Sequence, residues 1–403
     1  MSRSKFLGPD LLVVLALAVS LSPWSLFAQP AAAAITFDAV YTGEPISNLS
    51  GGAQTGGTYL DNLDLQINAE PGGIFGIPGL AGLLYVLYNN SNEFSAEYVG
   101  DAHIVSNIDA PRAWHIFEAW LDWAPRQDES VSLRAGLYDL NSEFDTHDTG
   151  GLFLNSAHGI GTDFSQSGLN GPSIFPVTSL ALRVRTAWGA GGYGQFAILD
   201  GVPGDPDDPE SSKIDLSDDD GALVVAELGW SGSDWRKLAV GAWVYTADFD
   251  PLTSPGGPQD DGNEGWYAIA DRTVWRGDSA TMAAFLRIGQ AEERFNPFGG
   301  YLGFGTTLAG FSARRPDDEL GVAVAIGLAG DEFKDSRRLD GLSTDSHETT
   351  IEFTYRAPIT DWLTLQPDFQ YVINPGTDPA LDDAVVVSLR FELGWSRLLS
   401  GGR

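Results

Sequence analysis

WLTLQPDFQYVI, residues 362–373, alternates apolar and polar side chains almost without interruption. Because successive side chains of a β-strand point to opposite faces, this pattern predicts a strand with one apolar and one polar face. Residues 348–356 (ETTIEFTYR) and 385–395 (VVVSLRFELGW) repeat the pattern on either side. It returns at 63–68, 117–123, 131–137, 180–185 and 237–245, so strands are predicted along nearly the whole chain.

Alternation alone fits two kinds of protein, a soluble sandwich with an apolar core and an outer-membrane barrel whose apolar face meets lipid. Three features favour the barrel: charges on the polar faces, Trp or Tyr at the ends of apolar faces, and alternation with no domain break. We therefore expect an all-β fold, a transmembrane antiparallel β-barrel of about 16 strands with a water-filled lumen. The charges are Arg134, Arg183, Arg185, Glu352, Arg356, Asp368 and Arg390, and the aromatics are Trp123, Trp188, Tyr355 and Trp395.

The N-terminus has the layout of an export signal. Arg3 and Lys5 precede the apolar run LLVVLALAV at 11–19, and four alanines follow at 31–34. This order predicts a cleaved secretory signal peptide over residues 1–34 and a porin barrel domain over residues 35–403. The alternative is a retained N-terminal anchor, but the run is shorter than the roughly 20 residues that a spanning helix needs.

The totals narrow the function classes. The formal net charge is −32, which argues against nucleic-acid binding because phosphate repels such a surface. The chain has no cysteine, so an exported protein of this sequence must gain stability from a large core or a closed sheet. Twelve Trp, 12 Tyr and 21 Phe suit the aromatic girdles of a barrel, although an acidic soluble lectin would share these totals.

Three stretches lack sustained alternation. Residues 201–221 and 251–265 are rich in Asp, Pro and Gly and predict exposed loops, with Asp218–Asp220 as solvated acids rather than a calcium site. Residues 139–176 are longer and contain Phe, Leu and Ile among Gly, Ser and Asn. A structureless run of this length is usually functional, so we expect it to fold into the lumen and narrow it. A mobile external loop is the alternative.

The sequence offers no motif for catalysis. The five histidines are scattered without paired ligand spacing, and His147 between Asp145 and Asp148 is the nearest approach to a metal cluster. Neither a GxSxG elbow nor a phosphate-binding loop is present, and no pair of carboxylates stands out for glycoside cleavage. We expect no metal, no cofactor and no enzymatic activity.

Two long segments resemble signatures of one family. EFTYRAPITDWLTLQPDFQYVINPG at 352–376 and GLYDLNSEFDTHDTGGLFLNSAHGIGTDFSQSGLNGPSIFP at 136–176 are similar to the C-terminal and second signatures of carbohydrate-selective porins, the OprB family. The resemblance implies a single-chain barrel of 16 antiparallel strands in the bacterial outer membrane. It also implies passive diffusion of mono- and small oligosaccharides into the periplasm.

The sequence departs from the family pattern in two ways. Such barrels commonly end on an aromatic residue, whereas here Trp395 ends the last alternating run and SRLLSGGR follows at 396–403. The chain is also more acidic than a sugar pore is expected to be. The first departure bears on assembly of the barrel and the second on its sugar preference.

A selective sugar pore needs hydrogen-bond donors and acceptors for hydroxyl groups and an aromatic surface for the ring, all binding weakly enough for release. Eight residues on predicted lumen faces, or close to them, fit these roles. The alternative for each is an ion pair or wall residue without contact to sugar. The candidates are Arg134, Arg183 and Arg185 as donors, Glu118, Asp139 and Asp368 as acceptors, and Trp120 and Trp243 as stacking surfaces.

The expected partners are small neutral sugars, outer-membrane lipid and lipopolysaccharide, and the barrel assembly machinery. Both a monomer and a trimer suit a barrel of this size. One rival interpretation is a secreted or periplasmic carbohydrate-binding β-protein, possibly a polysaccharide-active enzyme. A second is a barrel with a plugged lumen and a structural role.

Overall fold

The computed structural model describes residues 34–400 apart from 72–76, 92, 127, 207, 209–213, 215 and 218–219. The predicted signal peptide, except Ala34, and most of the Asp218–Asp220 cluster lie outside these residues. The strands are β1 (Ile35–Gly52), β2 (Gly56–Ala69), β3 (Leu80–Asn89), β4 (Ala113–Trp123), β5 (Val131–Tyr138), β6 (Ser179–Trp188), β7 (Gly192–Asp200), β8 (Ala222–Trp230), β9 (Trp235–Tyr245), β10 (Glu264–Arg276), β11 (Thr281–Ala291), β12 (Phe298–Ala309), β13 (Glu319–Ala329), β14 (His347–Thr360), β15 (Leu363–Ile373) and β16 (Asp382–Ser400). The short helices are η1 (Ser95–Val99), η2 (Leu140–Ser142), η3 (Thr149–Leu152), η4 (Ser156–His158), α1 (Thr162–Ser165), α2 (Asp331–Leu339) and η5 (Pro375–Thr377).

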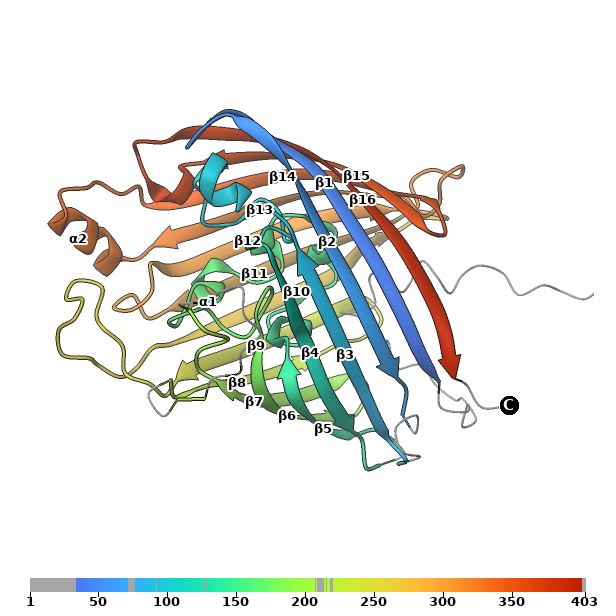
Figure 1. The fold of residues 1–403 in the computed structure, drawn as a ribbon. Coiled ribbons are helices and arrows are strands. Elements are labelled where there is room, and N and C mark those ends of the chain that lie inside the picture. Colours follow the sequence, from blue (N-terminus) through green and yellow to red (C-terminus); the bar gives the residue numbers. More distant parts are fainter. Residues whose placement is uncertain are drawn as a thin grey trace, which may run out of the picture.

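The strands form one closed barrel (Figure 1). Each strand pairs antiparallel with its neighbours in the chain, and β16 closes the barrel on β1. The predicted fold of 16 antiparallel strands is thus confirmed. Closure leaves no free strand edge, which a sheet surrounded by lipid requires. None of the helices among the described residues is long and apolar enough to cross a membrane.

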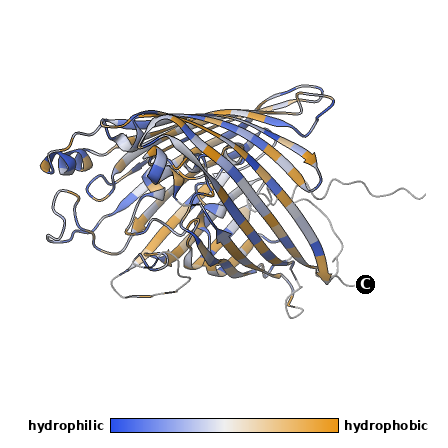
Figure 2. Ribbon diagram, turned by 45° about the horizontal axis from the view of Figure 1, so that its top comes forward, coloured by the Kyte–Doolittle hydropathy of each residue, from blue (hydrophilic) through white to orange (hydrophobic). Residues whose placement is uncertain are grey.

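Hydrophobic and hydrophilic residues alternate along the strands of the wall, as predicted (Figure 2). On β14 the Glu352 side chain is fully buried, while its neighbour Phe353 is 48% exposed on the outside. On β15, Gln370 is buried and Phe369 is 40% exposed. The polar parity therefore faces the interior, and the apolar parity forms the lipid-facing surface of a transmembrane barrel.

Tryptophans concentrate at one end of the barrel, where the strands are joined by the shorter turns. Aromatic rings with a polar edge favour the membrane interface, so this ring of indoles marks one interface. Short turns lie on the periplasmic side of such barrels, which places the longer connections outside the cell. The seven residues are Trp123, Trp188, Trp230, Trp235, Trp275, Trp362 and Trp395.

A β-bulge changes the parity of β4. The register of β3 and β4 shifts between the pairs Tyr85–Glu118 and Val86–Ile116. His115 and Phe117 point inward before the bulge, and Glu118 and its even-numbered successors point inward after it. The alternation over 117–123 predicts Phe117 on the apolar outer face, and this prediction is wrong because two residues of β4 oppose one of β3 at the bulge.

The last strand is longer than predicted. Alternation suggested that it ends at Trp395, but β16 continues to Ser400 and pairs Ser396 with Asp38 and Arg397 with Phe37 of β1. The segment 396–400 is therefore part of barrel closure rather than a trailing tail. Likewise, the last two residues of the predicted loop 251–265 belong to β10.

The segment between β5 and β6, residues 139–178, folds into the barrel as predicted. Its Thr149 amide donates to Asp271 of β10 at 2.9 Å, and its Leu154 amide donates to Glu352 of β14 at 2.6 Å. Tyr301 of β12 donates to the Ala157 carbonyl at 2.6 Å. This β5–β6 segment thus crosses the lumen from its own wall to the opposite one and narrows it.

A second segment also folds inward and was not predicted. Residues 90–112, between β3 and β4, carry η1 and pack against β1, β14 and β15. The Ala102 and His103 amides each donate to Glu348 at 2.9 Å, and the Val105 carbonyl accepts from Gln370 at 2.7 Å. This β3–β4 segment contains few of the Gly and Ser residues that mark the longer one, so its composition does not distinguish it from an ordinary connection.

Candidate functional site

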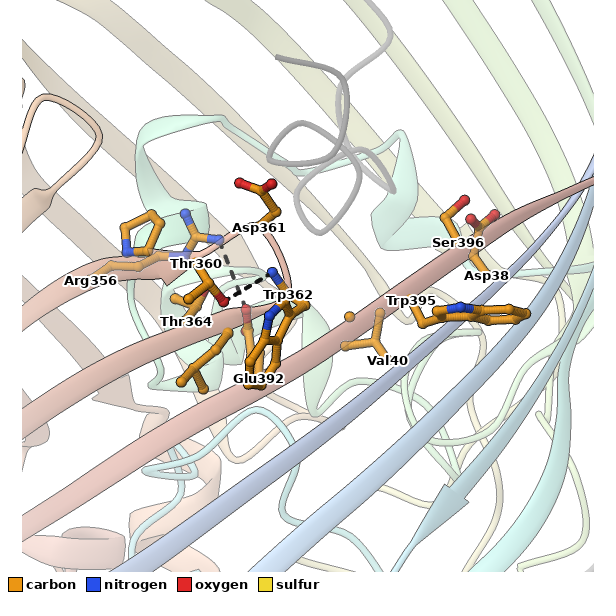
Figure 3. A pocket seen from close by; sticks show the side chains of 13 residues that line it. Asp38, Val40, Arg356, Thr360, Asp361, Trp362, Thr364, Glu392, Trp395 and Ser396 are labelled. Atoms are coloured by element: carbon orange, nitrogen blue, oxygen red, sulfur yellow. Dashed lines mark hydrogen bonds and ion pairs between the residues drawn. The ribbon is translucent and has the colours of Figure 1, made fainter. Parts of the chain in front are cut away.

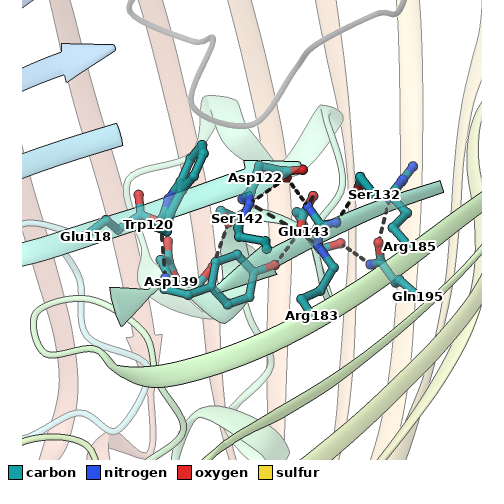
Figure 4. Close-up of polar contacts among 12 residues, drawn as sticks. Glu118, Trp120, Asp122, Ser132, Asp139, Ser142, Glu143, Arg183, Arg185 and Gln195 are labelled. Atoms are coloured by element: carbon teal, nitrogen blue, oxygen red, sulfur yellow. Dashed lines mark hydrogen bonds and ion pairs between the residues drawn. The ribbon is translucent and has the colours of Figure 1, made fainter. Parts of the chain in front are cut away.

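Six of the eight candidate residues lie together on the lumen wall formed by β4 to β7 (Figure 4). The bulge in β4 turns Glu118 and Trp120 inward. Arg134 of β5 and Arg183 of β6 face each other in register, and Arg185 of β6 faces Ser132. Asp139 follows directly where β5 ends. We call this set, with Asp122 and Glu143, the arginine cluster. Its members are Glu118, Trp120, Asp122, Arg134, Asp139, Glu143, Arg183 and Arg185.

Arg183 occupies the buried centre of the arginine cluster. Its Nε and Nη2 donate to the two Glu143 oxygens at 2.7 and 3.0 Å, and Nη2 also donates to Asp122 at 2.7 Å. The residue is 1% exposed. A guanidinium held in this bidentate geometry has few donors left, so Arg183 fixes the β5–β6 segment to the wall.

Of Arg134 and Arg183, Arg134 is the more accessible to solvent. Its Nε donates to Asp122 at 2.9 Å, and its guanidinium carbon lies 3.8 Å from the centre of the Trp120 ring. The Arg134 side chain keeps 15% of its surface exposed. Arginine stacked over indole presents its remaining N–H groups at the edge of an aromatic face, beside a carboxylate.

Glu118 connects the wall to the start of the β5–β6 segment. Its Oε1 accepts from the Trp120 indole at 3.0 Å and from the Asp139 amide at 3.2 Å. Asp139 in turn caps η2 by accepting from the Asn141 amide at 2.9 Å. Burial, and then the nearby Glu118 carboxyl, raise the pKa of Asp139 well above its ordinary value, so this side chain holds a proton readily.

Glu143 was not among the predicted site residues, although it organises the arginine cluster. Besides Arg183 it accepts from the Tyr138 hydroxyl at 2.5 Å, and its backbone carbonyl accepts from Gln195 at 2.9 Å. Burial would raise the pKa of Glu143, but the charges of Arg134 and Arg183 outweigh it and lower the pKa to about 2. Asp122 could have been found, because it shares the parity of Glu118 and Trp120, whereas Glu143 lies in a stretch without periodicity.

The remaining three candidates, one in the arginine cluster and two outside it, differ in their surroundings. Arg185 donates to Gln195 at 2.5 Å and lies over the Tyr193 ring at 4.3 Å, at the edge of the arginine cluster. Trp243 is 2% exposed and stacks on Phe164 of α1 with 4.9 Å between ring centres, so its face is occupied. Asp368 lies on β15, away from the arginine cluster, and accepts from Gln370 at 2.9 Å.

A second buried arginine, which was not among the predicted site residues, fixes the middle of the β5–β6 segment. Arg287 of β11 donates from Nε and Nη2 to both Asp145 oxygens at 3.0 and 2.6 Å, and from Nη1 to Asp163. Burial raises the pKa of Asp145 to about 6 even though Arg287 lowers it. Arg287 lies outside the segments whose alternation was singled out, and nothing in the sequence linked it to two aspartates more than a hundred residues earlier.

Comparison with known proteins agrees on one family. Residues 54–394 match the family described as carbohydrate-selective porin, OprB family. Porin B of Pseudomonas aeruginosa is 25% identical over 399 residues, covering 88% of this chain and 86% of that protein. The high-pH structure of Pseudomonas putida OprB superposes with a TM-score of 0.77 at 20% identity, covering 90% and 94% of the two chains. The low-pH structure of the same protein gives 0.57 at 16% identity over 90% and 93%.

Proposed function

The chain belongs to the carbohydrate-selective porin family, OprB, and from this membership we propose that it is a passive outer-membrane pore for mono- and small oligosaccharides. The fold and the family are those of a channel rather than an enzyme. The observation that carries the assignment of the site is the Arg134 guanidinium over the Trp120 ring, beside Asp122, where the β5–β6 segment narrows the lumen.

The chemistry of this arrangement suits a neutral sugar. The guanidinium edge of Arg134 donates to ring hydroxyls, and the Asp122 carboxylate accepts from them. The apolar C–H face of a pyranose packs on the part of the Trp120 ring that the Arg134 guanidinium leaves uncovered as the sugar passes. Arg183 acts as a positioning residue, since its donors are used by Glu143 and Asp122. Each contact is a single exchangeable hydrogen bond in water, so the sugar leaves again without an energy source.

Export and assembly complete the proposal. Residues 1–34 are removed as a signal peptide, and residues 35–403 are inserted by the barrel assembly machinery. The lipid-facing surface then contacts outer-membrane lipid and lipopolysaccharide as a monomer or a trimer. Heat-modifiable mobility in an outer-membrane fraction and N-terminal sequencing of the mature chain test these steps.

Liposome swelling tests the function and the site together. Wild-type protein should admit glucose, and Arg134→Ala and Arg183→Ala should each change the ratio of glucose to disaccharide entry. Arg126→Ala removes an exposed arginine from the β4–β5 turn and should leave the ratio unchanged. Unchanged ratios in both cluster variants would show that the arginine cluster is not the selective site. Lack of glucose entry through wild-type protein would refute the sugar pore itself.

A further inference from the structure

The negative charge of the chain is unevenly placed. Among the described residues, the connections at the extracellular end, which hold the longer segments, contain 24 Asp and Glu but only five Lys and Arg. The short turns at the opposite end contain eight acids and three bases. A solute therefore approaches the pore through a strongly acidic mouth. Its segments are 90–112, 139–178, 201–221, 246–263, 292–297, 330–346 and 374–381, together with 53–55, which is uncharged.

Inside the lumen, carboxylates neutralise the basic side chains. Each of six cations pairs with at least one carboxylate, and seven carboxylates take part. These pairs therefore leave no row of unpaired cations along which an anion could pass. A passing anion would meet carboxylate oxygens beside every such arginine. The pairs among the described residues are Arg134 and Arg183 with Asp122 and Glu143, Arg287 with Asp145 and Asp163, Arg356 with Glu392, Arg390 with Glu44, and Lys237 with Glu227.

Further carboxyl groups on the wall are matched only by neutral donors. Glu348 and Glu352 accept from backbone amides, Asp271 accepts from Thr149, and Asp64 accepts from the Tyr85 hydroxyl at 2.6 Å. Neutral donors add no positive charge, so each of these groups that is ionised makes the lumen more negative. Among the wall cations described above, only Arg185 is bound to a neutral acceptor, Gln195, and so adds positive charge to the lumen.

The periplasmic mouth continues this pattern (Figure 3). A cavity of about 60 Å³ lies there between β14, β15, β16 and β1, lined among others by Asp38, Arg356 and Glu392. Asp38 is 8% exposed, and its Oδ1 has no hydrogen-bond donor among the described residues, while Oδ2 accepts from Asn68 at 2.9 Å. Glu392 likewise keeps Oε2 without a donor, 3.8 Å from Arg356. These two carboxylate oxygens are acceptors that a donor-rich solute can use.

We propose that the pore selects solutes by charge: it admits neutral sugars, favours cationic amino sugars, and rejects sugar acids and sugar phosphates. This inference rests on the proposed function. Surface charge of one sign produces potentials of several kT at a channel mouth, which concentrate the attracted ion and deplete the repelled one. The cavity at Asp38 then supplies acceptors for an ammonium group as the solute leaves.

Reversal potentials in planar bilayers test the charge filter directly. Under a KCl gradient at low salt, where exposed charges act over about 30 Å, the wild-type potential should have the sign of potassium permeation. Replacing potassium by glucosamine hydrochloride, or chloride by potassium glucuronate, should show the glucosammonium ion to be roughly tenfold more permeant than glucuronate. A potential near zero, a potential of chloride sign, or equal permeation of the two organic ions would overturn the proposal.

Matched variants assign the effect to the lumen. Asp38→Asn removes a lumen carboxylate and should lower the permeability of glucosammonium relative to potassium. Asp128→Asn makes the same change in the exposed β4–β5 turn at the same end and should leave that ratio unchanged. Equal effects of the two variants would exclude the Asp38 cavity as a cation-binding site. Glucose entry with a chloride-type potential refutes the charge filter alone, whereas absence of glucose entry refutes the sugar pore.

Discussion

Replacing Arg287 by Met should release the middle of the β5–β6 segment and widen the pore. Arg287 is 2% exposed and is shared between Asp145 and Asp163 of that segment. Methionine replaces the aliphatic part of the arginine side chain and carries no charge, so the substitution leaves two buried carboxylates without their counter-ion. Removing one partner of a buried ion pair costs about 3–5 kcal/mol, which is a large part of the stability of a typical domain.

The β5–β6 segment can avoid this loss of stability by moving away from the wall. The strand ladder does not depend on Arg287, so moving the segment away lets Asp145 and Asp163 reach water while the barrel stays closed. Single-channel recording should therefore show a larger and noisier conductance, and urea denaturation in detergent should give a lower midpoint. Adding Asp145→Asn and Asp163→Asn to Arg287→Met removes the unpaired charges and should restore much of the midpoint.

The control is Arg276→Met. Arg276 pairs with Asp234 at 3.1 Å near the short turns, but both side chains are 54% exposed. Exposed pairs contribute about 0–1 kcal/mol, so neither conductance nor midpoint should move beyond that range. If Arg287→Met behaved like Arg276→Met in both measurements, the assignment of Arg287 as the anchor of the segment would be refuted.

Three further predictions address pH, packing and closure. Burial and the charge of Asp271 raise the pKa of Asp148 from 3.8 to about 6, so the native state binds a proton that the unfolded state releases. The unfolding midpoint should therefore rise as the pH falls from about 7 to 5, and Asp148→Asn should flatten this rise. An unaltered pH profile in this variant would count against the assignment. A Cβ on Gly321 would lie 2.8 Å from Leu152 and Phe153, so Gly321→Val should displace the β5–β6 segment at about 1–3 kcal/mol and raise conductance, which normal conductance would contradict. Ending the chain at Trp395 removes the last pairings of β16 with β1 and should reduce the folded, heat-modifiable fraction, whereas full assembly would show that residues 396–400 are dispensable.

The barrel was predictable because its signal is local. Alternation with period two specifies strand and face residue by residue, and it placed Arg134, Arg183 and Trp120 correctly in the lumen. It failed at Phe117, because a bulge shifts parity without any change in composition. It also failed beyond Trp395, where Arg397 and Leu398 weaken the pattern although β1 still supplies pairing partners.

The site was only partly predictable because its contacts are distant in sequence. Parity predicted that Arg134 and Arg183 face the lumen. It could not show that Glu143, which comes from a segment without periodicity, occupies the hydrogen-bond donors of Arg183. Trp243 has the parity of a lumen residue, yet Phe164 covers its ring. Parity gives the direction of a side chain, whereas its availability depends on which segment folds in against it.

The acidity that looked foreign to a sugar pore has a structural cause. The two inward segments leave strand pairing, so their amide groups lack ladder partners and need acceptors inside the barrel. Wall carboxylates supply them: Glu118, Glu227, Asp271, Glu348 and Glu352 each accept at least one backbone N–H from these segments. A narrowed lumen of this design therefore needs carboxyl groups before any solute enters. The proposed selectivity against anionic sugars would then follow from the same residues that hold the constriction in place.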